Sequence, residues 1–157
     1  MDYNDDIMYD RIDGMFVEDT TYKKTTSYIP IAMGHLLKIK YCTNSRNYVG
    51  WYLSVKDSLV ETYKSICKDK QIKLGEFLDN DKYGKFFNEN MSDFYNDGIK
   101  IYKEAMKTYP DLKQGWKYIP AECPWTFSQL MNALFIDDDN DFAVSIKELL
   151  NKLPDMK

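Results

Sequence analysis

The sequence predicts an all-α protein: a single domain of five or six helices built around an antiparallel helical hairpin. Apolar residues recur at spacings of three and four over most of the 157 residues, as they do along one face of an α-helix. Strand-type alternation is never sustained, and no internal repeat or low-complexity tract divides the chain. With thirteen Tyr, eight Phe and three Trp, the chain has enough bulky side chains to fill one core.

The predicted hairpin covers Tyr28–Lys70, with a polar turn at Thr43–Asn47 between its two helices. A connector this short favours antiparallel neighbours. The apolar face of the second helix consists of Tyr52, Val55, Leu59, Tyr63 and Ile66, widened by Trp51, Val60 and Cys67. In the first helix, Lys38 and Lys40 are expected to be free to reach water.

Within the single domain, residues 1–27 are interpreted as an acidic N-terminal lead and residues 28–157 as the core. Apolar residues at helical spacing predict a short helix over residues 5–17. A polar linker is expected from Glu18 to Ser27. Pro30 would then lie in the first turn of the next helix, where a proline is tolerated.

The second half of the chain is predicted to begin with a long helix, Phe87–Tyr109, which Pro110 ends because proline cannot continue a helix. A loop, Asp111–Pro124, follows. Thr126 is a favourable N-cap for a short helix over Phe127–Phe135.

A last helix is predicted over Phe142–Leu153, after a run of acidic residues. Asp141 is expected to be its N-cap, and acidic side chains at this end would favour the positive end of the helix dipole.

Several short motifs together resemble a known family. They are His35-Leu36-Leu37-Lys38, Trp51 with Ser54 and Val55, Tyr102 with Ala105, and Ile119-Pro120-Ala121-Glu122-Cys123-Pro124-Trp125-Thr126. In order and spacing, residues from about 30 to 135 resemble the bacterial family called domain of unknown function 29. The chain departs from the family pattern before residue 30 and over residues 71–84. The resemblance implies an all-helical domain and no activity, cofactor or site.

The Pro120–Thr126 block is interpreted as a structural clasp. Its prolines fix the backbone, Trp125 inserts as an anchor, and Cys123 acts as a small apolar group. The alternative is a loop that presents an exposed tryptophan to a partner.

Charge is distributed unevenly along the chain. Residues 1–30 carry a net charge of −4, residues 31–78 of +4 and residues 79–157 of −4. The acidic flanks either compensate the basic centre within the fold or face a basic partner. Only two of the 21 basic residues are Arg, and no basic patch is concentrated enough to predict nucleic-acid binding.

The three cysteines are far apart and form no CxxC pair, so neither a disulfide framework nor a metal site is predicted. No signal peptide and no apolar run of about 18 residues is found, so no membrane association is expected. The expected location is the cytoplasm.

His35 is the only histidine, and it lies within an amphipathic helical segment. A packing role is favoured over that of a general base. Cys42 is too far along the same helix for direct contact with His35, so a Cys–His nucleophile is not expected. Because the usual catalytic motifs are also missing, the sequence favours a protein that is not an enzyme and uses no cofactor.

The candidate partner-binding residues form the acidic turn, which is Asp137, Asp138, Asp139 and Asp141. With Glu148 they approach a calcium-loop template, but Phe142 occupies the position where that template needs glycine for its sharp turn. Helix capping or partner contact is therefore favoured over metal binding.

Small size, acidic flanks and missing catalytic parts favour a cytoplasmic binding protein. The most concrete hypothesis is an immunity or antitoxin-type inhibitor that blocks a cationic toxin, such as a nuclease, by stoichiometric contact. The alternative is a helical housekeeping or mobile-element protein, including one that self-associates.

Overall fold

The computed structural model describes residues 9–12, 15–43, 48–67, 81–132 and 139–156. Over these residues the chain is an all-α domain, as predicted, preceded by one short β-hairpin. In order, the elements are β1 (Tyr9–Ile12), β2 (Met15–Glu18), α2 (Asp19–Tyr41), α3 (Tyr48–Cys67), α5 (Asp81–Ala105), the 3₁₀ helix η2 (Pro110–Tyr118), α6 (Phe127–Asn132) and α7 (Asp139–Leu150).

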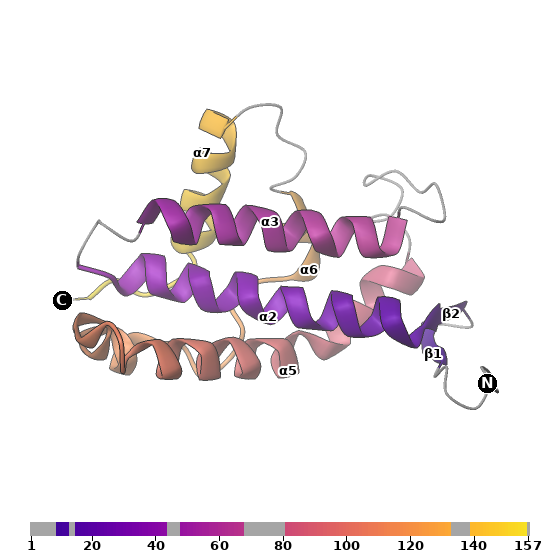
Figure 1. Ribbon diagram of the computed structural model, residues 1–157, viewed down its shortest axis with the longest axis horizontal. Helices are drawn as coiled ribbons and strands as arrows, with labels where there is room; N and C mark the ends of the chain where they lie inside the picture. The colour runs from indigo at the N-terminus through magenta and orange to yellow at the C-terminus, as the bar shows by residue number, and fades with distance from the viewer. Residues whose placement is uncertain (1–8, 13–14, 44–47, 68–80, 133–138, 157) are drawn as a thin grey trace.

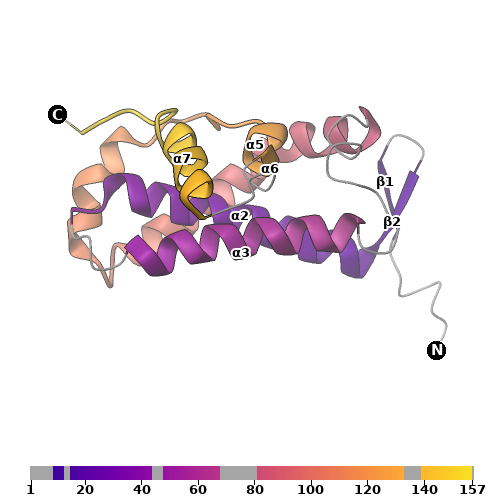
Figure 2. The ribbon, with the colours of Figure 1, turned by 90° about the horizontal axis from the view of Figure 1, so that it is seen from above.

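The helical hairpin is present as α2 and α3, which lie side by side and run in opposite directions (Figures 1 and 2). The face of α3 that meets α2 carries the predicted Trp51, Val55 and Leu59, all buried. Because α2 lies at the centre of the domain, it contributes the largest share of the core. Its buried apolar residues are Ile29, Ala32, Met33, Leu36, Leu37, Ile39 and Tyr41, and the buried Cys42 follows directly after the helix.

On its other side, α2 packs against α5, which runs in the same direction (Figure 1). Two glycines allow the backbones to approach closely at the crossing. A methyl group added to Gly34 would lie 2.8 Å from Ile101 Cγ2, and one added to Gly98 would lie 3.0 Å from Met33 Cβ. Neither position has room for a larger side chain.

The segment from η2 to α7 crosses one face of this helical layer (Figure 2). Its first part is fixed at the C-terminal end of α2, where the ring of Tyr41 stacks on Tyr118 at 6.5 Å. The Tyr41 hydroxyl donates a hydrogen bond of 2.8 Å to the Pro154 carbonyl, which ties down the end of the chain. Lys40 adds an ion pair with Asp155.

Two predictions about the N-terminal region are wrong. In place of a helix over residues 5–17, the described residues form antiparallel strands in which Tyr9 pairs with Glu18 and Ile12 with Met15. The two intervening residues are Asp13 and Gly14, a dipeptide that favours tight hairpin turns. Residues 5–8 lie outside the described residues.

The predicted polar linker is also absent, because α2 begins at Asp19 and places Pro30 inside the helix. A helix that has already nucleated extends at little cost into a polar segment, since each further residue adds one hydrogen bond. The boundary proposed at residue 27 therefore falls within a continuous helix.

Three further boundaries differ from the predictions. The α-helix α5 ends at Ala105, and hydrogen-bonded turns continue to Tyr109, whose N–H donates to Ala105 O at 2.8 Å. Pro110 then opens a 3₁₀ helix rather than a loop, because its fixed φ suits a first helical turn. The last helix begins at Asp139, so Asp141 is not its N-cap.

Candidate functional site

The short helix α6 is held in place by contacts of its N-cap and of its first residue. Thr126 is its N-cap, as predicted: Gln129 N donates 3.1 Å to Thr126 Oγ1, and Thr126 N donates 2.9 Å to Gln129 Oε1. This reciprocal pair is a capping box. Phe127 stacks on Phe87 at 4.5 Å, and its N–H donates 3.0 Å to Asn88 Oδ1. The position of α6 on α5 is therefore fixed by both polar and apolar contacts.

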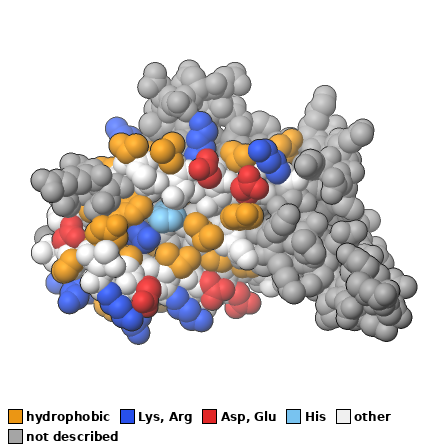
Figure 3. All heavy atoms as spheres, in the orientation of Figure 1, with side chains coloured by type: hydrophobic (Ala, Val, Ile, Leu, Met, Phe, Trp, Pro, Cys, Tyr) orange, Lys and Arg blue, Asp and Glu red, His pale blue; other side chains and the backbone are white. Residues whose placement is uncertain are grey.

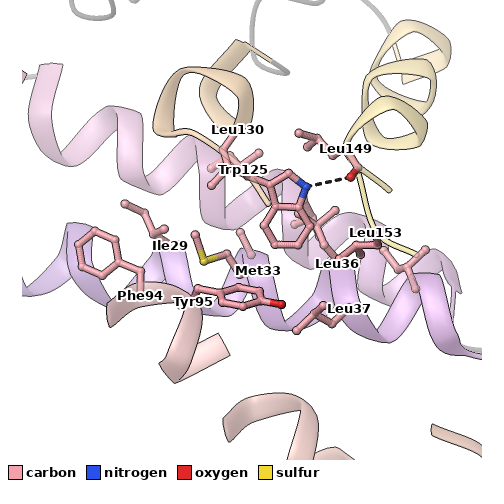
Figure 4. Packing of buried hydrophobic residues seen from close by; sticks show 14 of the residues in the cluster. Ile29, Met33, Leu36, Leu37, Phe94, Tyr95, Trp125, Leu130, Leu149 and Leu153 are labelled. Carbon is pink, nitrogen blue, oxygen red and sulfur yellow. Dashed lines mark hydrogen bonds between the residues drawn. The ribbon is translucent and has the colours of Figure 1, made fainter. Parts of the chain in front are cut away.

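Trp125 joins α6 to the end of α7. The indole is buried and donates a hydrogen bond of 2.8 Å from Nε1 to the Leu149 carbonyl (Figure 4). It lies among apolar residues of α2, α6 and the C-terminal segment, including Leu36, Leu130 and Leu153 (Figure 4). This geometry agrees with the clasp interpretation and excludes an exposed tryptophan at this position. Cys123 is half-buried, and its thiol donates to Trp125 O at 3.3 Å.

A hollow of about 500 Å³ lies between α6 and α7. Six of its seven lining residues have polar side chains, and one is apolar. The lining residues are Gln129, Asn132, Ser145, Glu148, Leu149, Asn151 and Lys152. Amide and hydroxyl groups both donate and accept hydrogen bonds, so this surface is suited to peptide groups and polar side chains.

The acidic turn leads directly into the helix that forms one wall of this hollow. Asp139 is the first residue of α7, and Asp141 lies in its first turn. That end of α7 stands farthest from α2 (Figure 1). Asp137 and Asp138 lie outside the described residues. Asp139 and Asp141 therefore lie at the projecting end of α7, about two helical turns before Glu148.

The chemistry of α7 also bears on the calcium-loop alternative. Asp139 and Asp141 belong to a regular helix, whereas the template requires a loop at these positions. Among the described residues, no group of three or more His, Cys, Asp and Glu side chains is placed to hold a metal ion.

His35, the one histidine, is visible on the face shown in Figure 3, with hydrophobic side chains to either side of it and a basic side chain next to it. Lys38 Nζ is 3.5 Å from His35 Nδ1 and 5.7 Å from the centre of the Trp51 ring. Contrary to the prediction for this residue, Lys38 is only 8 % exposed. Its ammonium nitrogen lies over the ring of Trp51, and this cation–π contact replaces part of the lost hydration.

Burial and, to a smaller extent, the charge of Lys38 together lower the pKa of His35 from 6.5 to about 4. Burial also lowers the pKa of Lys38. His35 is therefore neutral near pH 7, which agrees with the predicted packing role. Within the described chain, its hydrogen-bonding partner is Lys38, so no nucleophile is placed for the imidazole to activate.

The cysteine nearest to His35 in the sequence has other contacts. Cys42 Sγ lies 3.8 Å from Asp111 Oδ2, and Thr43 Oγ1 donates to the same oxygen at 2.9 Å. Neither Cys42 nor Cys123 is part of a disulfide among the described residues. These contacts join the end of α2 to η2 and give Cys42 a structural position.

A second hollow, of about 450 Å³, was not predicted from the sequence. Its lining residues are Lys113, Gln114, Trp116, Lys117, Tyr118 and Met156. The sequence predicts a loop over Asp111–Pro124, and a loop gives no reason to place two lysines and a tryptophan on one surface. The spacing of Lys113, Trp116 and Lys117 would have indicated this surface if a helix had been expected there.

The α6–α7 hollow was also missed, since amide and hydroxyl side chains in short helices form no motif. The one feature of the sequence that indicates this hollow is that the polar ends of two predicted helices lie close to the acidic turn.

Comparison of the chain with family models, with curated proteins and with solved structures finds no match. None of the helices in the described residues is both long enough and apolar enough to cross a membrane.

Proposed function

We propose that this chain is a cytoplasmic binding protein that holds a basic protein partner against the α6–α7 surface, in the manner of an immunity or antitoxin-type inhibitor. By the α6–α7 surface we mean the hollow between these helices together with the acidic turn. The observation that carries the proposal is that α7, whose acidic first turn projects from the domain, lines a hollow of mostly polar residues with its C-terminal half.

The two parts of this surface would have different tasks. Carboxylates on a projecting helix end would attract a cationic partner and orient it before contact. The hollow would then accept a loop of the partner, because its volume is in the range of sites that hold a few side chains. Asn132 and Asn151 can each donate and accept hydrogen bonds to a backbone that enters there.

The positions of α6 and α7 support this assignment. The capping box at Thr126, the Trp125–Leu149 hydrogen bond and the stacking of Phe127 fix the walls of the hollow. A preformed surface loses little conformational entropy when a partner binds. The resemblance to domain of unknown function 29 is compatible with this proposal, and membership of that family is likewise a proposal.

The experiment is a co-purification with a matched control. The acidic variant changes Asp137, Asp138 and Asp139 to Asn. The control variant removes the same number of charges elsewhere, by changing the exposed Glu89, Asp93 and Glu122 to Gln, Asn and Gln. We expect the wild type and the control to retain a basic protein in a constant molar ratio, and the acidic variant to lose it.

Identical retention by all three proteins would contradict the proposed surface. Retention of no basic protein by the wild type would contradict the proposed class of partner. Far-ultraviolet circular dichroism of each variant shows whether the helices are intact.

A further inference from the structure

Trp116 is a partly exposed aromatic residue on a rigid support. It is 39 % exposed, and its ring stacks on the buried ring of Tyr102 with centres 6.2 Å apart and planes 24° apart. The Tyr102 hydroxyl donates to the Leu112 carbonyl, and the adjacent Gly115 packs directly on Tyr41. The exposed indole is therefore held in one orientation, as in aromatic residues that anchor a ligand.

Two lysines flank this ring. Lys113 and Lys117 line the same hollow of about 450 Å³, and both are exposed. Within the described part of the chain, neither forms an ion pair with a carboxylate. Lys117 Nζ lies 5.3 Å from the centre of the Tyr118 ring, which keeps its charge over the hollow. We call this surface the Trp116 hollow.

This combination selects a ligand that carries both negative charge and a planar or apolar group. An exposed indole offers a face for stacking, and the two ammonium groups offer positive charge without bidentate geometry. A long polyanion such as a nucleic acid is disfavoured, because the whole chain has a net charge of −4. A short acidic peptide with an aromatic residue fits better.

The chain contains such a peptide. Residues 1–8 read MDYNDDIM and include three Asp, no Lys or Arg, and Tyr3. This segment joins β1 at Tyr9, which pairs with Glu18, so it begins beside the start of α2. The Trp116 hollow lies at the other end of α2, next to Tyr41.

The length of α2 prevents the acidic segment from reaching the hollow of its own molecule. From Asp19 to Tyr41 the helix spans about 33 Å, at about 1.5 Å for each residue. Between Tyr9 and Asp2, even a fully extended chain spans only about 24 Å. The hollow of a neighbouring molecule is not subject to this limit.

We propose that the chain self-associates head to tail, with residues 2–6 of one copy bound in the Trp116 hollow of another. Asp2, Asp5 and Asp6 face Lys113 and Lys117, and Tyr3 packs on the Trp116 indole. This contact is heterologous, because it joins different surfaces of the two copies. A segment of five residues buries little area, so the association is weak and depends on salt.

A charge exchange tests this contact with the full-length chain. The first variant changes Asp2, Asp5 and Asp6 to Lys, and the second changes Lys113 and Lys117 to Glu. Each variant alone places like charges in the contact, so we expect its self-association in sedimentation experiments to weaken by about tenfold. In an equimolar mixture, contacts between the two different variants pair opposite charges in either direction, whereas contacts between copies of the same variant do not. We therefore expect the mixture to recover most of the wild-type association through alternating contacts.

The result that overturns the proposal is a mixture that associates no better than either variant alone. Undiminished association of the first variant would overturn it too, as would a wild type that is monomeric at all concentrations at low salt. Loss of association on changing Asp137, Asp138 and Asp139 to Asn, with no effect of the first variant, would assign the contact to α7 and reject this one.

A peptide experiment identifies the ring involved. Peptide MDYNDDIM is titrated into the first variant, and tryptophan fluorescence is recorded. We expect the fluorescence change to saturate as peptide is added. With Trp116→Phe added to the first variant, the fluorescence change should disappear, because the two remaining tryptophans, Trp51 and Trp125, are buried. The same peptide with Asn in place of its three Asp should bind at least about tenfold more weakly. Equal binding of the two peptides would contradict the role of charge.

Discussion

Gly34 of α2 and Gly98 of α5 face each other where the two helices cross. A methyl group on Gly34 would lie 3.1 Å from the Gly98 carbonyl oxygen, and one on Gly98 would lie 3.2 Å from the Gly34 nitrogen. These backbone atoms lie in the way in addition to the side chains of Ile101 and Met33, and the backbone cannot move aside as the end of a side chain can. The distance between α2 and α5 therefore depends on both glycines.

Changing Gly98 to Ala should lower the free energy of unfolding by about 1–3 kcal/mol, because overpacking outweighs the better helix propensity of alanine. Gly50 in α3 is the matched control, since a methyl group there meets no atom within 4 Å. Gly50→Ala should raise stability by up to about 1 kcal/mol. Chemical denaturation measures both. A stabilising Gly98→Ala change would show that the two helices are not in close contact.

Trp51 should be a major contributor to stability. Its ring is buried and meets Tyr109 edge to face at 5.3 Å. Trp51→Ala should cost about 3–5 kcal/mol, as large-to-small core changes do. Leu53 of the same helix is 55 % exposed, and Leu53→Ala should have little effect. Equal melting temperatures for the Trp51 variant and the wild type would disagree with the burial of this ring.

Trp125→Phe tests the hydrogen bond of the clasp apart from its packing. The phenyl ring keeps most of the apolar contacts and removes the donor to Leu149 O. The Leu149 carbonyl would keep its hydrogen bond from Lys152 N at 3.2 Å, so the loss of the second one should cost about 0.5–1.5 kcal/mol. Because that carbonyl belongs to the end of α7, its amides should also exchange hydrogen faster in this variant. Unchanged exchange along α7 would mean that the indole does not hold this helix.

The contact between His35 and Lys38 makes a prediction about pH. The pKa of folded His35 lies near 4, below the ordinary 6.5, so the unfolded chain binds a proton first as the pH falls. The stability that neutral His35 contributes is therefore fully present above pH 6.5 and should be lost progressively as the pH falls toward 4. His35→Gln should flatten this dependence in the upper part of that range, where most carboxylates are still ionised.

An NMR titration separates the two causes of the shift. Lys38→Met removes the charge but not the burial, so the pKa of His35 should rise above about 4 and stay below 6.5. The same change should raise the free energy of unfolding at neutral pH, since it replaces a buried ammonium that pairs with no carboxylate of the described residues by an apolar group. An unchanged pKa of His35 in the Lys38→Met variant would contradict the contact between these two side chains.

Helical periodicity was sufficient to predict the core of this fold. Trp51, Val55 and Leu59 lie on the buried face of α3 as their spacing indicates, and Thr126 caps α6 as its residue type indicates. These features depend on local sequence alone. The β-hairpin was missed because helical spacing of apolar residues was given more weight than the turn signal of Asp13 and Gly14.

The remaining differences depend on tertiary contacts that one sequence does not display. Lys38 is buried, and its ammonium nitrogen lies over the ring of Trp51, which belongs to another helix. The Trp116 hollow exists because Tyr41, Tyr102 and Gly115 bring η2 onto the ends of two helices. In the candidate site, the acidic turn was identified from the sequence, whereas the polar hollow beside it required the packing of α6 on α7.

The most direct test of the account is the association rate of the co-purified basic partner with the wild type, the acidic variant and its charge-matched control at increasing salt. We expect the wild type and the control to associate rapidly with the partner at low salt, and their association rates to fall steeply as salt is added. The variant that lacks the charges of Asp137, Asp138 and Asp139 should be slower at low salt and nearly insensitive to salt. Equal rates and equal salt dependence for the acidic variant and the control would contradict binding at the α6–α7 surface.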